Sequence, residues 1–259
     1  MRPSVRLAIV HVVLLARVQA AWRSKPTATA TTTVVLAPGL VVIRNALSEQ
    51  EQRRLAADAT RVGRRRRNGF ADADVARLRI YERTSRLPSD FVKLCRRTVG
   101  IAVSADGAAM PSCDATHCLI NKYTSSKGLL WHRDIYANDG DGDKPIVNLS
   151  VGASCVFGVR DDRSGRTHRV TLRSGDALLF GGACRFAKHA VLKVLLDETP
   201  AWMMASDREE PFRLSFTFRE APSVLGREAY YRTFEIKRRW FEQTQRAWRH
   251  GDPLVADPA

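Results

Sequence analysis

The chain has 259 residues, with 42 Lys and Arg residues against 27 Asp and Glu residues and a formal net charge of +15. Its 44% of hydrophobic and 27% of charged residues are typical of a globular protein, and they exclude a disordered tail, a collagen-like fibre, a coiled coil and a bilayer-spanning architecture. A charge this positive favours polyanionic partners, nucleic acid first and an anionic membrane surface second, but it does not choose between them.

The first 33 residues have the composition of a targeting presequence. They contain no acidic residue, and Arg2 and Arg6 precede the apolar run 7–16, which is too short to span a bilayer. Residues 23–33 are rich in Thr and Ala and positively charged, which is typical of a transit peptide. We therefore expect residues 1–33 to direct import into a mitochondrion or a plastid, leaving a body with a net charge of +10. The alternative is a disordered basic arm, or a wrongly assigned start, on a cytoplasmic or nuclear protein.

Two helices are expected in the segment of residues 34–116. Ser48 and Glu51 have the Ser-x-x-Glu spacing of a capping box, and the apolar residues that follow at helical spacing predict a helix over residues 49–62. Residues 90–100 also carry apolar residues on one helical side and basic residues on the other. Both helices precede the residues that carry the chemistry.

Short runs of strand-forming residues separated by turns begin at His117. The expected strands cover residues 118–123, 146–151, 155–159, 169–172, 177–180 and 214–218. Such regular short strands predict a sandwich or barrel over residues 117–220. Residues 221–259 are expected to form a basic helix with an aromatic stripe that docks onto this domain, followed by a tail.

His132 and Asp134 are two potential metal ligands on one side of an extended segment, because side chains two positions apart project to the same face. Such a pair often occurs by chance, so it gains meaning only with a third ligand, for which His189 is available beyond several strands. Two His and one carboxylate form the facial set that binds Fe(II) and leaves three positions open for a cosubstrate and oxygen. A lone His189 would otherwise be a hydrogen-bonded histidine of the core or the surface.

A second pattern places two guanidinium groups on one face of the last expected strand. Arg213 and Arg219 are six positions apart, so both face the same side as Ser215 and Thr217. Two inward-facing Arg residues in a barrel require an anion. The alternative for Arg213 is an ion pair with a structural carboxylate such as Glu220.

These features occur in an order that resembles the AlkB family of Fe(II)- and 2-oxoglutarate-dependent dioxygenases. The resemblance covers residues 117–220 and rests on four motifs: Asn121-Lys-Tyr123, His132-Arg-Asp134, the run from Ser174 to Gly182 that leads to His189, and Arg213 to Arg219. It implies an α+β fold, with a double-stranded β-helix, or jelly-roll, core and flanking N-terminal and C-terminal helices.

The resemblance also implies roles for the matching residues and a reaction. The family's iron ligands correspond to His132, Asp134 and His189. The family's 2-oxoglutarate-binding residues correspond to Asn121, Tyr123, Arg213 and Arg219. In that family Fe(II), 2-oxoglutarate and O2 together oxidise a C–H bond with release of succinate and CO2, and a hydroxylated N-methyl group then yields formaldehyde.

Alkylated DNA or RNA is the substrate that the resemblance and the basic charge favour together. The family's substrate-recognition lid would correspond to residues 64–90, with Phe70 and Tyr81 as residues that stack on a flipped base. The basic run from Arg64 to Arg67 would contact phosphates there, or it would form a solvated turn.

Two other functions stay open. Tyr136 and Phe180 differ from the residues with which the family reads the damaged base, which leaves both the identity of the base and the choice between base and peptide undecided. The first alternative is a hydroxylase or demethylase that uses the same iron centre on a protein or a small molecule. The second is a non-catalytic β-barrel that binds nucleic acid, and the complete set of ligands argues against it.

Overall fold

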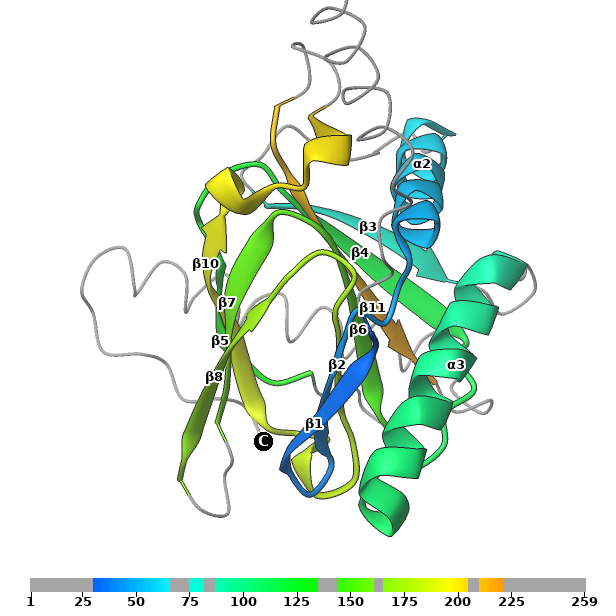
Figure 1. The fold of residues 1–259 in the computed structure, drawn as a ribbon, viewed down its shortest axis with the longest axis vertical. Coiled ribbons are helices and arrows are strands. Elements are labelled where there is room, and N and C mark those ends of the chain that lie inside the picture. Colours follow the sequence, from blue (N-terminus) through cyan, green and yellow to red (C-terminus); the bar gives the residue numbers. More distant parts are fainter. Residues whose placement is uncertain are drawn as a thin grey trace, which may run out of the picture. The chain divides into compact units, whose positions relative to one another are not determined.

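The computed structural model describes residues 30–65, 75–81, 87–134, 144–160, 165–204 and 210–220. These residues form two sheets that face each other, with two helices on the outer side of the larger sheet (Figure 1). Residues 1–29, Phe70, Tyr136 and the helix expected beyond residue 220 lie outside the described part, so the predictions made for them stay predictions. None of the described helices is long and apolar enough to cross a membrane.

The larger sheet has seven strands in the order β1-β2-β9-β6-β11-β4-β3. Their bounds are, in chain order, Thr32–Ala37 (β1), Leu40–Arg44 (β2), Val75–Tyr81 (β3), His117–Tyr123 (β4), Ile146–Gly152 (β6), Ala177–Phe180 (β9) and Arg213–Arg219 (β11). The smaller sheet has the order β5-β10-β7-β8, with bounds Leu129–His132 (β5), Ser154–Arg160 (β7), Thr167–Leu172 (β8) and Lys188–Leu195 (β10). Neighbouring strands are antiparallel throughout, which confirms the expected jelly-roll architecture.

The central strands of the larger sheet are buried on both faces and divide their side chains between two cores. In β11, Phe216 and Phe218 face the helices, whereas Ser215 and Thr217 face the smaller sheet. In β9, Leu179 belongs to the helix side, and its neighbours in the strand belong to the core between the sheets. Because the inner face carries polar residues on several strands, apolar side chains do not fill all of the space between the sheets.

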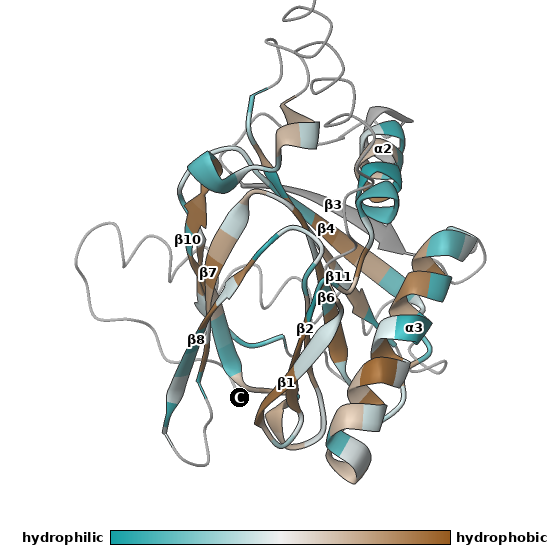
Figure 2. Cartoon of the chain, in the orientation of Figure 1, coloured by the Kyte–Doolittle hydropathy of each residue, from teal (hydrophilic) through white to brown (hydrophobic). Residues whose placement is uncertain are grey.

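The two helices, α2 (Glu49–Arg65) and α3 (Ser89–Asp106), cover the outer face of the larger sheet. Phe91 of α3 packs edge-on against Phe216 and Phe218 of β11, with ring centroids 5.6 and 6.0 Å apart. Figure 2 shows that α2 is largely hydrophilic, whereas α3 is hydrophobic over part of its surface. Helix α3 therefore packs against β11, the strand that begins at Arg213 and ends at Arg219.

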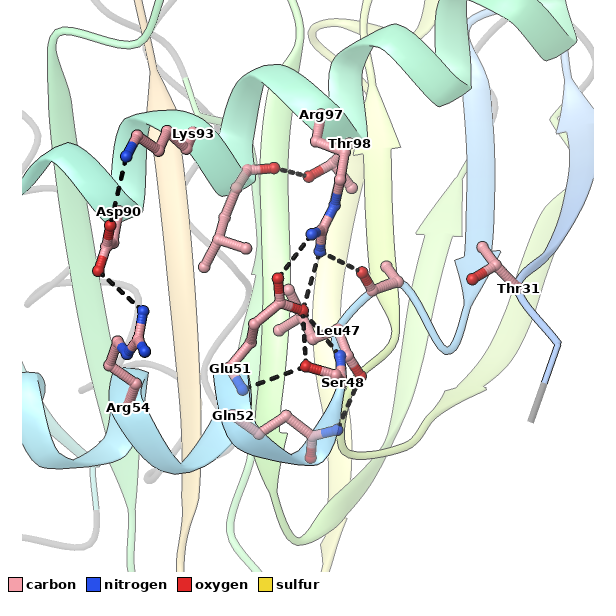
Figure 3. A network of polar contacts seen from close by, with 12 residues as sticks. Thr31, Leu47, Ser48, Glu51, Gln52, Arg54, Asp90, Lys93, Arg97 and Thr98 are labelled. Atoms are coloured by element: carbon pink, nitrogen blue, oxygen red, sulfur yellow. Dashed lines mark hydrogen bonds and ion pairs between the residues drawn. The ribbon is translucent and has the colours of Figure 1, made fainter. Parts of the chain in front are cut away.

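Polar contacts join the start of α2 to α3 (Figure 3). The capping box predicted from the sequence is formed, because the Ser48 main-chain N–H donates to Glu51 at 2.8 Å and the Glu51 N–H donates to Ser48 Oγ at 3.3 Å. Arg97 of α3 donates to both carboxylate oxygens of Glu51, at 2.6 and 3.0 Å, and to the Ala46 carbonyl at 2.7 Å. One carboxylate thus caps α2 and holds it against α3.

Among the described residues, the expected helices and strands are all present, and most extend a few residues further. Helix α2 continues through Arg65, so the basic run begins inside a helix rather than in a turn. Strands β1, β2 and β3 precede residue 117 and still join the larger sheet, and β5 and β10 complete the smaller one. These five strands were not predicted from the sequence, although the β-branched runs of β1 and β2 flank Pro38 and Gly39, a pair typical of a turn.

Candidate active site

A cavity of about 130 Å³ lies between the two sheets. One wall, from β4, β6 and β11, is largely polar, and it includes Asn121, Asn148, Ser215, Thr217 and Arg219. The facing wall comes mainly from the smaller sheet and is apolar apart from two histidines, with Leu129, Phe157 and Val191 among its residues. The cavity therefore has a hydrogen-bonding side and a hydrophobic side.

His132 and His189 enter this cavity from neighbouring strands and are direct cross-strand partners. The Nδ1 atom of His132 lies 2.7 Å from the Leu130 carbonyl oxygen, and that of His189 lies 3.0 Å from the Ala187 carbonyl oxygen. A carbonyl only accepts hydrogen bonds, so each Nδ1 carries a hydrogen, and in the neutral form of each ring the lone pair that can bind a metal lies on Nε2. Both Nε2 atoms face Asp134, at 3.9 and 3.6 Å from its carboxylate oxygens.

Asp134 follows β5 directly and completes a compact group of three. One potential ligand atom from each of the three side chains lies within 4.8 Å of the others. Arg219 donates a short hydrogen bond to the carboxylate, and Arg185 donates to the main-chain carbonyl of Asp134 at 2.8 Å. Burial alone would raise the pKa of Asp134, but Arg219 and the two imidazole rings hold that pKa well below its ordinary value. The carboxylate is therefore ionised and ready to bind a cation.

Two glycines let β5 lie close to its neighbours. A Cβ atom at Gly128 would lie 1.7 Å from the Val191 carbonyl oxygen, and a Cβ at Gly158 would lie 2.7 Å from the ring of Trp131. Trp131 directly precedes His132 in β5. The missing side chains thus allow the edge strand, and with it His132, to sit where the three side chains meet.

Arg213 lies at the other end of β11, one step beyond Ser215. Its side chain is fully buried and donates to Ser150 Oγ at 3.0 Å and to the Ala153 carbonyl at 3.3 Å, but its Nε atom has no hydrogen-bond partner among the described residues. The alternative ion pair with Glu220 is not formed, since Glu220 accepts from the main-chain N–H of Asp114. Among the described residues no carboxylate neutralises Arg213, so its charge calls for an anion.

The other two residues matched to cosubstrate binding, Asn121 and Tyr123, line the cavity from β4. Asn121 pairs in register with Ser215, and Tyr123 pairs with Arg213. The Asn121 Oδ1 atom is buried and has no hydrogen-bond partner among the described residues. Asn121 and Tyr123 therefore continue the polar wall toward Arg213. Arg219 lies apart from them, against Asp134.

Some residues of the site were not singled out in the sequence. Asn148 lines the cavity, Ser150 contacts Arg213, and Arg185 holds the segment that contains Asp134. The alternation of polar and apolar residues in the strand that contains Asn148 and Ser150 is the signal that indicates both. Arg185 lies in a turn, where periodicity gives no such signal.

Comparison with known families shows to which family the chain belongs. The model of a family described as the 2OG-Fe(II) oxygenase superfamily matches residues 70–219, which is more than half of the chain. The chain belongs to this superfamily. The match includes all seven residues proposed from the sequence for metal and cosubstrate, although it assigns no role to any of them.

Within the 2OG-Fe(II) oxygenase superfamily the chain is similar to AlkB proteins. It is 27% identical to the DNA N(6)-methyladenine demethylase ALKBH1C of Arabidopsis thaliana, over 72% of this chain and 49% of that protein. It is 34% identical to the alpha-ketoglutarate-dependent dioxygenase AlkB of Salmonella typhimurium, over 52% of this chain and 56% of that protein. These matches confirm the resemblance to AlkB, and the chain spans about half the length of both relatives.

A solved structure supports the fold of this oxygenase. The structure of OsALKBH1 superposes with a TM-score of 0.64 at 23% sequence identity, covering 72% of this chain and all of that one. At this identity the likeness concerns the fold alone. It supports the jelly-roll arrangement of the two facing sheets.

Proposed function

We propose that this protein is an Fe(II)- and 2-oxoglutarate-dependent dioxygenase that oxidatively demethylates alkylated bases in DNA or RNA. The observation that carries the proposal is the convergence of His132, Asp134 and His189 in a cavity whose polar wall runs along β11 toward the buried Arg213. Relatives named as AlkB, as a DNA demethylase and as a tRNA demethylase support the reaction.

The three donors fit Fe(II). Two imidazole nitrogens and one carboxylate oxygen make up a facial set, which leaves coordination positions open. The main-chain carbonyls that accept from both Nδ1 atoms fix the tautomer and orient each Nε2 lone pair. When bound, Fe(II) supplies with 2-oxoglutarate and O2 the oxidation of a C–H bond, which on an N-methyl group leads to formaldehyde, succinate and CO2. Arg219 keeps Asp134 ionised and oriented.

The buried cation and the amide on the polar wall fit 2-oxoglutarate. A buried guanidinium without a carboxylate partner is stabilised by a bound anion, and Arg213 has a planar group suited to a carboxylate. In the register of β4 and β11, Tyr123 lies beside Arg213 and Asn121 lies beside Ser215, one step toward Arg219, and we assign Asn121 and Tyr123 to the same cosubstrate. Apolar side chains such as Leu129, Phe157 and Val191 form the opposite wall of the cavity.

An exposed aromatic ring beside the site supports a nucleic-acid substrate. Phe186 is 37% exposed, and the guanidinium of Arg185 lies 4.9 Å from its ring centroid. Arg133, which lies between His132 and Asp134 in the sequence, donates to the Phe186 carbonyl at 2.6 Å. Aromatic rings next to Arg residues stack on nucleic-acid bases, so this position suits a nucleotide close to the metal ligands.

The substrate class is tested by a screen of succinate release. The Fe(II)-loaded protein is supplied with 2-oxoglutarate and with methylated DNA or RNA oligonucleotides, their unmodified counterparts, or peptides from a cell extract. We expect release above the uncoupled background with methylated oligonucleotides alone. Release that depends on peptides instead would establish the alternative of a protein hydroxylase.

We also propose that residues 1–33 direct the protein to a mitochondrion or a plastid, on the composition given above. A fluorescent protein fused behind these residues should be imported into one of the two organelles. Diffuse cytoplasmic or nuclear fluorescence would contradict the proposal.

A further inference from the structure

Asn148 is a buried amide on the polar wall of the cavity. It lies on β6, is 5% exposed and lines the cavity together with Ser215 and Thr217 of the neighbouring strand. In the register of β6 and β11, Asn148 pairs with Thr217, one step along the same face from Arg219. It therefore sits nearer to the end of β11 that contacts Asp134 than to the end that holds Arg213.

One end of the Asn148 amide is satisfied and the other is not. Its Nδ2 atom lies 2.7 Å from Ser215 Oγ and 3.3 Å from Thr217 Oγ1. Its Oδ1 atom is buried and has no hydrogen-bond partner among the described residues. A buried polar atom left without a partner costs free energy, so this side of the amide is suited to contact a bound ligand.

The two hydroxyl groups allow the amide to turn over. A Ser or Thr hydroxyl both donates and accepts, so Ser215 and Thr217 bind the amide oxygen as well as they bind the amide nitrogen. With the amide reversed, Oδ1 accepts from both hydroxyls and the two N–H groups of Nδ2 face the cavity. A cation in the cavity favours the first orientation, and an anion favours the second.

The surroundings of Asn148 select an anion. Arg219 lines the same wall, and Arg213 is buried further along the same face of β11. Asp134 is the only carboxylate among the described residues that line the cavity, and Arg219 and the two histidines already face it. A ligand bound at this wall would therefore lie near a net positive charge and near the neutral Asn148 amide, which can donate hydrogen bonds.

We propose that Asn148 is a cosubstrate-binding residue, which donates from Nδ2 to the carboxylate of 2-oxoglutarate nearer the metal ligands, while Ser215 and Thr217 position its amide. This inference rests on the proposed function. It adds a residue that lies outside the four matched to cosubstrate binding by resemblance, and it explains why an amide occurs among apolar neighbours in β6.

Two substitutions separate the donor role from mere packing. Asn148→Ala removes the hydrogen bond, and we expect the dissociation constant for 2-oxoglutarate to rise about tenfold, in the range for hydrogen bonds to charged groups. Asn148→Asp keeps the shape but replaces the donor with an anion, so the rise should exceed that of Asn148→Ala. A dissociation constant for 2-oxoglutarate that is the same in Asn148→Ala as in the parent would overturn the proposal.

The measurement is an anaerobic calorimetric titration of the full chain loaded with Fe(II), which needs no turnover. Affinity for Fe(II) without 2-oxoglutarate should be unchanged in Asn148→Ala. The matched control is Val147→Ala, the adjacent position of β6, whose side chain faces the helices. It should lower the melting temperature and leave the 2-oxoglutarate affinity unchanged.

The double variant Ser215→Ala with Thr217→Val tests the positioning role. Loss of both hydroxyls removes the hydrogen bonds that hold the Asn148 amide, and we expect the affinity for 2-oxoglutarate to fall about threefold. Adding Asn148→Ala to this double variant should weaken binding by less than Asn148→Ala does in the parent. Equal affinities in the parent and both Asn148 variants would overturn the inference and leave the proposed function intact. A parent protein that binds no 2-oxoglutarate would instead overturn the proposed function, and the inference with it.

Discussion

His132 and His189 pair directly across β5 and β10, with their ring centroids 4.3 Å apart and each Nδ1 held by a main-chain carbonyl. Strand pairing therefore brings together two residues that are far apart in the sequence and gives them the same tautomer. Asp134 joins them from the turn after β5. The three candidate metal ligands thus come from the smaller sheet and the residue that follows its edge strand. The residues assigned to 2-oxoglutarate come from the larger sheet.

The first prediction concerns the metal. Each of His132→Ala, Asp134→Ala and His189→Ala removes one of three donors, and we expect stoichiometric Fe(II) binding to be lost, as measured by anaerobic calorimetry. The control is His168→Ala in β8, which lies outside the cavity lining and should bind Fe(II) like the parent. Full Fe(II) binding and activity in His132→Ala or Asp134→Ala would refute the ligand assignment.

The second prediction concerns Arg213. Lys keeps the charge but not the planar fork, so Arg213→Lys should fold and bind Fe(II) while its affinity for 2-oxoglutarate falls by about 1.5–3 kcal/mol. This corresponds to a roughly ten- to hundredfold higher dissociation constant. Anaerobic titration of the Fe(II)-loaded protein measures it, with thermal melting as the check on folding. An unchanged titration would show that another cation holds the carboxylate.

The pair of His132 and Asp134 and the pair of Arg213 and Arg219 could be predicted from the sequence, because side chains two positions apart in an extended chain project to the same face. That rule placed His132 beside Asp134, and Arg213 on the face of Ser215 and Thr217. The pairing of His132 with His189 has no local signal, since it depends on the register of two strands that meet through tertiary folding. Resemblance to a family supplied that link.

Two strands and one contact between helices could not be predicted from the sequence either, because they lack a regular local pattern. Strand β5 is only four residues long and half-buried, so it has no pronounced alternation. Strand β10 combines a cavity-facing histidine with lysines, which blurs its apolar face. The partner of Glu51 in α3, Arg97, lies on another helix, and no spacing within α2 indicates it.

The third prediction concerns the close approach at β5. In Gly158→Ala the new methyl group collides with the ring of Trp131, so this ring, on the residue that directly precedes His132 in β5, must move. We expect lower stability, by about 1–3 kcal/mol as for overpacked cores, and weaker Fe(II) binding. Denaturant unfolding and metal titration measure the two effects.

Its control is Gly100→Ala in α3, where a Cβ meets no atom within 4 Å. There the change should stabilise the protein by about 0.5–1 kcal/mol, because Ala is the better helix former, and Fe(II) affinity should not change. Normal Fe(II) affinity in Gly158→Ala would show that β5 is positioned by other contacts.

The fourth prediction concerns pH and the pair of Glu51 and Arg97. The hydrogen bonds from Arg97 lower the pKa of Glu51 below its ordinary value of 4.5. A carboxyl group with a lowered pKa in the folded state stabilises the protein above its unfolded pKa, and this contribution is lost as the pH falls through the folded value. Glu51→Gln should therefore destabilise by about 1 kcal/mol at pH 7, in the range for a partly exposed pair, and by less at pH 3.

Denaturant unfolding at both pH values checks this prediction. Arg54→Gln serves as the control, because its contact with Asp90 also joins α2 to α3 but lies at the surface. It should cost less than Glu51→Gln at pH 7. An equal cost of Glu51→Gln at pH 7 and pH 3 would mean that the helix cap, rather than the charge, carries the effect.

The central claim is that the His132, Asp134 and His189 centre removes methyl groups from nucleic acid through 2-oxoglutarate oxidation. The most direct measurement is the parallel count of formaldehyde, succinate and restored bases when the Fe(II)-loaded protein meets an oligonucleotide with a single methylated base. We expect one formaldehyde and at least one succinate for each base restored, with no restoration when Fe(II) or 2-oxoglutarate is omitted or in the Asp134→Ala variant. Restored bases that do not require Fe(II) and 2-oxoglutarate, or succinate release without formaldehyde from every methylated oligonucleotide, would contradict it.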